Sequence, residues 1–142
     1  MINHFRDAYN FLSNFYEAPV TYDGLTFKNN ESAFQSAKAR NVNQKRIFTQ
    51  TDGKAAKRLG RKVALREDWE DIKEDLMADI VWAKFTQNSD LQEKLLATGD
   101  QKLVEGNTWN DTYWGVCNGR GQNKLGKILM QVRDELRLRT HD

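Results

Sequence analysis

The chain has 142 residues, a length that normally forms one domain with one core, so we expect a single domain over residues 1–142. Lys and Arg number 22 against 20 Asp and Glu, and this near balance does not by itself indicate a nucleic-acid or membrane partner. Cys117 is the only cysteine, which excludes an internal disulfide. No apolar run approaches the length of a membrane span and no signal-peptide pattern opens the chain, so we expect a cytoplasmic protein that does not bind a membrane.

Local patterns near the N-terminus predict a hairpin followed by a helix. Asp23-Gly24 favours a two-residue turn, and the alternating residues around it predict a β-hairpin over 19–28. Asn30 is the expected cap of the next helix, with Glu31 in its first turn.

Apolar periodicity predicts the remaining elements. They are helices over about 53–62 and 68–85, a helix that begins with the capping box Ser89/Gln92 and ends at Gly99, a short strand over 102–105, and a terminal helix that begins near Asn123. The predicted fold class is therefore α+β, a helix-dominated single domain with a small β-sheet.

Glu31, Gln35 and Lys38 have spacings of four and seven residues, which place them on one face of the predicted helix. One interpretation is the solvated face of an amphipathic helix. The other is chemical, because a carboxylate can stabilise an oxocarbenium-like sugar and a lysine can attack C1 to form a Schiff base.

A basic stretch follows over residues 53–62. Its cations recur at helical spacing and suit a diphosphate or a nucleic-acid backbone, although a solvated basic face is the alternative. They are Lys54, Lys57, Arg58, Arg61 and Lys62, to which Arg66 adds one more.

In the N-terminal segment, Arg6 and Asn14 lie among aromatic residues that include Phe15, and can read a phosphate or a base edge if the aromatics line a pocket. His4 and His141 are isolated, and no cysteine or histidine pair has metal-ligand spacing. We therefore expect no metal and no cofactor.

Residues 109–121, WNDTYWGVCNGRG, have neither helical nor strand periodicity and read as a binding loop. Its glycines permit positive φ or a close approach to a ligand, and the N-terminus of the helix after it favours an anion. Trp109, Tyr113 and Trp114 offer flat faces for a base or sugar, and Asp111 offers a carboxylate. An ordinary turn with buried aromatics is the alternative.

Several separated motifs resemble the NADAR family, also called the YbiA-like N-glycosidase family, in order and nearly from end to end. They are FLSNFY at 11–16, ESAFQSAK at 31–38, LGRKV at 59–63, the stretch 69–77, KLLATG at 94–99, LVEGN at 103–107, DTYWG at 111–115 and GQNKLGKILMQVR at 121–133.

The resemblance implies cleavage of an N-glycosidic bond to ribose, with Glu31 and Lys38 as lead catalytic residues. Asp111 or Glu105 is the expected acid that protonates the departing base, and Ser32 stands where many members have histidine. The residues expected to contact the substrate are Arg6, Asn14, Phe15, Gln35, Arg61, Trp69, Glu105, Trp114, Gly115 and Asn123.

Three functions follow from the resemblance. The first is removal of ADP-ribose from ADP-ribosylated guanine in DNA, RNA or a nucleotide, with nucleic-acid contact through Lys54, Lys57, Arg58 and Lys62. The second is an N-glycosidase acting on phosphoribosylaminopyrimidine intermediates of riboflavin synthesis. The third is a sensor that binds ADP-ribose or NAD without cleaving it. The sequence leaves the oligomeric state open.

Overall fold

The computed structural model describes residues 1–140, so His141 lies outside the described part of the chain. The chain groups into two compact units, which we call the terminal unit (Met1–Ser13 with the chain from Asp90 onward) and the central unit (Asn14–Ser89). Helices dominate and the strands form two small sheets, which confirms the predicted fold class. The expectation that the whole chain is one domain stays a prediction.

The central unit begins with a hairpin of β1 (Glu17–Tyr22) and β2 (Leu25–Asn29), paired antiparallel with Tyr22 opposite Leu25. Both turn residues have positive φ, 52° for Asp23 and 82° for Gly24. Paired positive φ angles match the right-handed twist of the strands. The hairpin predicted from this dipeptide is confirmed.

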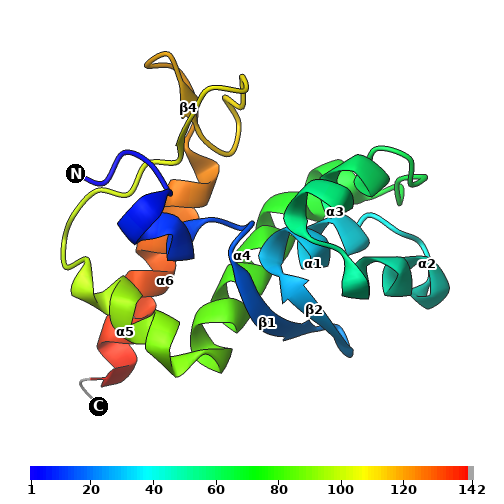
Figure 1. Ribbon diagram of the computed structural model, residues 1–142, viewed down its shortest axis with the longest axis horizontal. Coiled ribbons are helices and arrows are strands. Elements are labelled where there is room, and N and C mark those ends of the chain that lie inside the picture. The colour runs from blue at the N-terminus through cyan, green and yellow to red at the C-terminus, as the bar shows by residue number, and fades with distance from the viewer. Residues whose placement is uncertain (141–142) are drawn as a thin grey trace. The chain divides into compact units, whose positions relative to one another are not determined.

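Helix α1 (Asn30–Ser36) follows directly and is buried along its whole length. It contacts β2, α3 (Gly53–Gly60), α4 (Trp69–Gln87) and the 3₁₀ helix η2 (Ile47–Gln50), and so lies at the centre of its unit (Figure 1). The predicted cap was wrong by one residue. Asn29, the last extended residue of β2, accepts a hydrogen bond from the Ser32 amide at 2.7 Å.

The end of α1 also differs from the prediction. The helix stops at Ser36, and the Lys38 amide donates to the Gln35 carbonyl three residues back, at 3.2 Å. Such a tightened turn is common at helix ends. Lys38 therefore lies in the turn after α1 and does not continue its face. The short helix α2 (Val42–Arg46) comes next.

Two glycines let other parts of the central unit approach closely. A Cβ on Gly60, at the end of α3, would overlap the side-chain amide of Gln35 on α1. A Cβ on Gly53, at the start of α3, would lie 2.7 Å from the Phe15 ring. Both positions therefore require the absence of a side chain, and Gly60 sets how closely α3 lies to α1.

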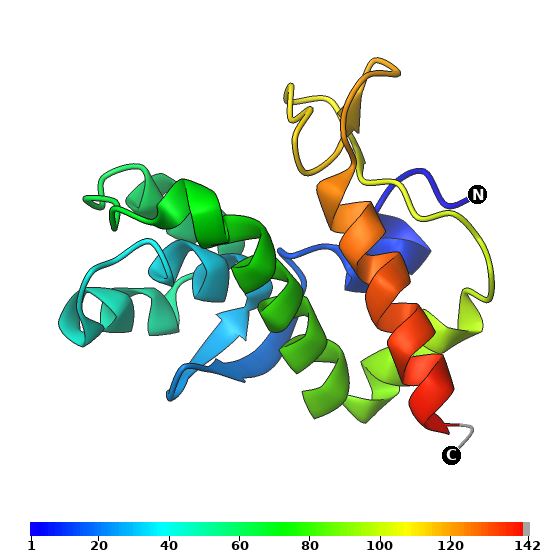
Figure 2. The ribbon, with the colours of Figure 1, turned by 180° about the vertical axis from the view of Figure 1, so that it is seen from behind.

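Helix α4 contacts β1 and α1 and is the longest helix of the unit, as predicted (Figure 2). It buries the cation Lys84, which is 1% exposed. The Lys84 Nζ lies 5.5 Å from the centre of the Tyr16 ring and 5.1 Å from that of Phe85. Removal from water lowers the pKa of Lys84 to about 7.

The terminal unit contains η1 (Asp7–Leu12), α5 (Ser89–Ala97) and α6 (Lys124–Thr140). Arg133 of α6 donates to the Thr98 hydroxyl and the Gln101 carbonyl, which ties α6 to the end of α5. Gly99, with φ of 64°, follows α5 as predicted. Within residues 1–140, no helix combines the length and the apolar character needed to cross a membrane.

The predicted strand over 102–105 was wrong. Leu103 forms only an isolated bridge with Ile2, while the parallel strands are β3 (Gly106–Asn107) and β4 (Val116–Cys117). The Ile2 amide donates to the Lys102 carbonyl at 2.9 Å and the Val104 amide to the Ile2 carbonyl at 2.8 Å. These two bonds make the single bridge between Ile2 and Leu103, and the pairing does not continue to a second residue pair, so no strand forms over 102–105.

The buried amine of Lys84 predicts a stability that rises with pH. Its pKa is about 7 in the folded state and near 10.5 when unfolded, so between these values the unfolded chain binds more protons. The free energy of unfolding should therefore increase across this window, by on the order of several kcal/mol. Denaturant unfolding of the natural protein and of Lys84→Met at pH 7, 8.5 and 10 measures this. The stability of Lys84→Met relative to the natural protein should fall as pH rises. If the free energies of unfolding of the two proteins changed in parallel with pH, the lowered pKa would not belong to Lys84.

Gly60→Ala should destabilise the protein by about 1–3 kcal/mol, because the new methyl group meets the buried Gln35 amide. In a Gln35→Ala background the overlap is gone, so the same change should be neutral or stabilising. Chemical unfolding of the four proteins gives the coupling energy. Equal losses in both backgrounds would show that the two side chains do not compete for one space.

Candidate functional site

The predicted site residues fall into two groups, one in each unit. The central unit holds Asn14, Phe15, Glu31, Gln35, Lys38, Arg61 and Trp69. The terminal unit holds Arg6, Glu105, Asp111, Trp114, Gly115 and Asn123.

Glu31 and Gln35 form a buried pair on α1. They are 8% and 6% exposed, and the Gln35 Nε2 donates to the Glu31 Oε1 at 2.8 Å. A solvated polar face is therefore the wrong interpretation for these two residues. A buried carboxylate is costly without a hydrogen-bond donor, and Gln35, one helical turn away, supplies one.

Lys38 is half-buried in the turn after α1, with its Nζ 5.8 Å from the centre of a Trp69 ring. Phe34 packs on the same indole at 5.1 Å between ring centres. Burial lowers the pKa of Lys38, and the charges of Arg61, Lys57 and Lys73 lower it further, while the Glu31 carboxylate opposes them. The net direction is downward, which increases the fraction of neutral amine available for attack.

The predicted site residues Asn14 and Phe15 contact α1 and α3. The Asn14 carbonyl accepts the Glu31 amide at 2.9 Å, and the Asn14 side chain donates to the Met77 sulfur at 3.5 Å. Phe15 is 42% exposed and lies against Gly53. Lys54, Arg58, Arg61 and Lys62 are exposed, whereas Ala56 on the opposite side of α3 is buried.

In the terminal unit, Asp111 organises the loop. Its Oδ1 accepts the amides of Tyr113 at 3.1 Å and Trp114 at 2.9 Å, an arrangement typical of a turn closed by an aspartate side chain. One carboxylate oxygen of Asp111 is therefore used in the hydrogen bonds that fold the loop. Its role as the acid that protonates the departing base stays a prediction.

Asn107 links the predicted acids and was missed from the sequence. Its Nδ2 donates to the Asp111 carbonyl at 2.9 Å and to the Glu105 Oε2 at 3.2 Å, and its Oδ1 accepts the Asp111 amide at 3.1 Å. The Glu105 carboxylate lies against Gly115, where a Cβ would overlap it. Asn107 is the last residue of the LVEGN motif, and that motif is the signal that could have found it.

The predicted anion site at the start of α6 is wrong. The Lys124 amide donates to the Tyr113 carbonyl at 3.1 Å and the Leu125 amide to the Trp114 carbonyl at 2.9 Å, so the loop itself satisfies these donors. Asn123, buried with φ of 53°, accepts the Glu105 amide and donates to the Leu103 carbonyl. Its side chain therefore holds the loop, and a contact with substrate stays a prediction.

Comparison with known proteins identifies the family. The NADAR domain model matches residues 2–137. The N-glycosidase YbiA of Escherichia coli (strain K12) is 40% identical over 134 residues, which cover 92% of this chain and 83% of that protein. A protein of Vibrio vulnificus (strain YJ016), named as a riboflavin biosynthesis protein, is also 40% identical, over 92% of this chain and 36% of that protein.

A solved structure agrees with this match. The NMR structure of the E. coli protein YbiA aligns with a TM-score of 0.86 and 35% identity, and covers 100% of this chain and 90% of that one. The family model spans nearly the whole chain and the similarity extends to three dimensions. The chain belongs to the NADAR family.

Proposed function

We propose that the protein is an N-glycosyl hydrolase that cleaves the bond between a ribose C1 and a base nitrogen, with Lys38 as nucleophile and Glu31 as electrostatic stabiliser. Relatives named N-glycosidases support the reaction class. The observation that carries the assignment to residues is the half-buried amine of Lys38, whose pKa is lowered although a carboxylate lies nearby. A nucleophilic lysine needs this environment, because only the neutral amine attacks.

The proposed reaction has three steps. As the bond from C1 to the base breaks, its electron pair leaves with the base nitrogen, which takes up a proton, and Glu31 stabilises the positive charge at C1. The Lys38 amine bonds to C1 and loses a proton. Opening of the sugar ring gives an imine, which water hydrolyses to free the sugar and restore the amine.

Glu31 suits its role because its position is fixed. The Gln35 amide holds one carboxylate oxygen at 2.8 Å, and Gly60 leaves space for that amide beneath α3. A preorganised charge need not reorient as the transition state forms, which is the main source of electrostatic catalysis.

We propose ADP-ribosylated guanine in nucleic acid as the substrate. Residues 38–66 contain ten Lys or Arg and one acid, although the whole chain has a net charge of only +2. This segment includes Lys38 itself and the exposed cations of α3. Such segregated charge favours a polyanion, since each phosphate that it contacts releases condensed counterions.

A second candidate is a phosphoribosylaminopyrimidine of riboflavin synthesis. The observation that favours it is the similarity to the Vibrio vulnificus protein that is named for riboflavin biosynthesis. This substrate offers the same bond from C1 to nitrogen but only one phosphate, so it makes little use of an extended basic segment.

Turnover in the presence of borohydride tests the reaction and the substrate together. The protein is incubated with ADP-ribosylated DNA and, separately, with phosphoribosylaminopyrimidine, and the released base and sugar are identified. Borohydride should reduce the imine to a stable secondary amine, detected by mass spectrometry on the peptide that contains Lys38. Lys38→Arg, which keeps the charge, should lose activity and the adduct. A Lys38→Arg variant that stays active without forming an adduct would show that Lys38 is not the nucleophile.

The pH dependence of turnover offers a second test. The rate should rise with pH as Lys38 loses its proton, and Lys57→Gln should move this limb to higher pH, because Lys57 is one of the cations that lower the Lys38 pKa. Lys54→Gln removes the same charge one turn earlier on α3, but Lys54 is not among the charges that lower the Lys38 pKa, so its limb should stay in place. If the rising limb of the pH profile shifted equally in both variants, the shift would reflect the net charge of the protein and not a specific effect of Lys57 on Lys38.

A further inference from the structure

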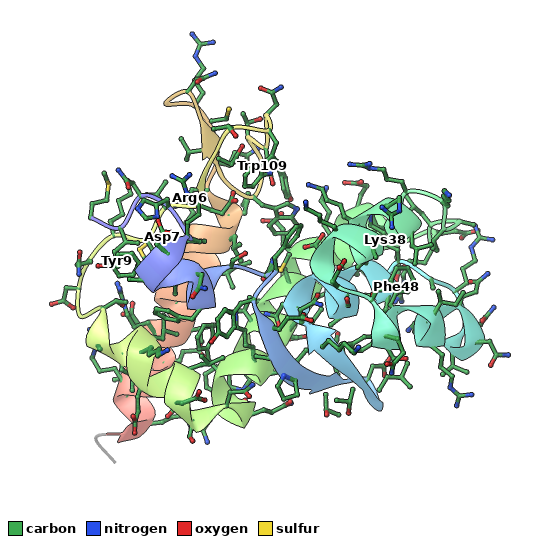
Figure 3. The ribbon with its side chains drawn as sticks, viewed as in Figure 1. Arg6, Asp7, Tyr9, Lys38, Phe48 and Trp109 are labelled. Atoms are coloured by element: carbon green, nitrogen blue, oxygen red, sulfur yellow. The ribbon has the colours of Figure 1, made fainter. Side chains whose placement is uncertain are left out.

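The amine of Lys38 is sheltered without being enclosed. It is half-buried, with its Nζ 5.8 Å from the centre of a Trp69 ring, whereas Lys54 and Lys62 in the basic stretch nearby are exposed. Lys38 lies near α3 in the central unit (Figure 3), where the charge of Arg61 acts on its amine. A small reagent can therefore reach this amine, which has lost part of the hydration that favours its protonated form.

Glu31 supplies a fixed carboxylate near this amine. Its side chain is 8% exposed, and the Gln35 amide holds its Oε1 at 2.8 Å. Among the charged groups that act on the Lys38 amine, Glu31 has the largest effect, so the two side chains lie within electrostatic reach of each other. A carboxylate held beside a reacting centre can take up a proton and return it, as general-base catalysis requires. The pair therefore places a nucleophile and a base together.

An imine between Lys38 and a ribose has a second fate besides hydrolysis, because the carbon next to C1 carries a hydroxyl. If a base removes the proton from C2, the electron pair of that C–H bond forms a C1–C2 double bond, and the iminium nitrogen recovers its own pair. A proton then adds to C1 while the C2 hydroxyl loses its proton, which gives an amine at C1 and a ketone at C2. C2 is oxidised and C1 is reduced, so no external oxidant or reductant is needed. The resulting ketoamine contains no imine for water to cleave.

We propose that Lys38 is also a site of irreversible modification by free aldoses that carry a hydroxyl at C2, with Glu31 as the base that converts the first imine to a ketoamine. The inference rests on the proposed attack of Lys38 on C1. It does not depend on which candidate is the substrate, because the ribose released from either carries this hydroxyl. The sugar product therefore inactivates the enzyme unless a further reaction consumes the free aldose.

Incubation with ribose 5-phosphate tests the proposal, followed by removal of the sugar and peptide mass spectrometry without a reductant. Ketoamine should accumulate at Lys38 at least about tenfold faster than at Lys54 and Lys62, the exposed internal controls. N-glycosidase activity should fall in proportion and should not return once the sugar is removed. Glu31→Gln, whose Oε1 can still accept the Gln35 hydrogen bond, should slow ketoamine formation by about tenfold or more. Borohydride added to a parallel sample of this variant should still trap the imine.

2-Deoxyribose 5-phosphate is the matched control, because it forms the imine but has no C2 hydroxyl that can become a ketone. It should give an adduct at Lys38 that borohydride traps, and none that survives removal of the sugar. Persistent adducts from both sugars, equal modification of Lys38 and the exposed lysines, or an undiminished rate in Glu31→Gln would overturn the proposal. Trapped imine without ketoamine would overturn it and leave the proposed hydrolase standing. Ketoamine at Lys38 in a protein that releases no base would support it and remove the hydrolase.

Discussion

The central unit depends on one contact, the amide of Gln35 held between the Glu31 carboxylate and the surface of Gly60. A carboxylate that is 8% exposed requires a hydrogen-bond donor, and the donor itself requires space beneath the adjacent helix. Gly60 provides the space because it has no side chain. The same close approach of α3 to α1 brings the charges of Lys57 and Arg61 to bear on Lys38. The position of the Glu31 carboxylate and the lowered pKa of the Lys38 amine therefore both depend on the close approach of α3 to α1.

The sequence predicted those elements whose signals are local. The Asp23-Gly24 turn and the long apolar periodicity of α4 are properties of neighbouring residues, and both elements were found. Asn29 and Asn30 are chemically identical candidates for the same cap, so only the end of β2 decides between them. The end of α1 was missed for a similar reason, because neither glycine nor proline marks Ser36 as its last residue.

The site was predictable as a set of residues but not as an environment. Motifs pointed to Glu31, Gln35 and Lys38, whereas their burial depends on α3, some 25 residues further along the chain. The terminal unit behaves alike. Asn107 and Asn123 look like ordinary turn residues in the sequence, yet their side chains bond to backbone up to 20 residues away. The start of α6 is closed to anions for a similar reason, because the amides of Lys124 and Leu125 donate to carbonyls of the loop before it.

The charges around Lys38 act in two opposing ways once a substrate is present. The charges of Arg61, Lys57 and Lys73 lower the pKa of Lys38, and two of them, Arg61 and Lys57, are also where phosphates would dock. A bound phosphate near Arg61 would offset part of that cationic influence and favour protonation of the amine. Docking would also exclude water, and desolvation is the largest cause of the lowered pKa. These two effects move the pKa of Lys38 in opposite directions. The amine therefore stays neutral and reactive during binding only if the exclusion of water lowers its pKa more than the bound phosphate raises it. The buried indole of Trp69 beside Lys38 meets this condition better than an exposed helix face, because it excludes water and carries no charge.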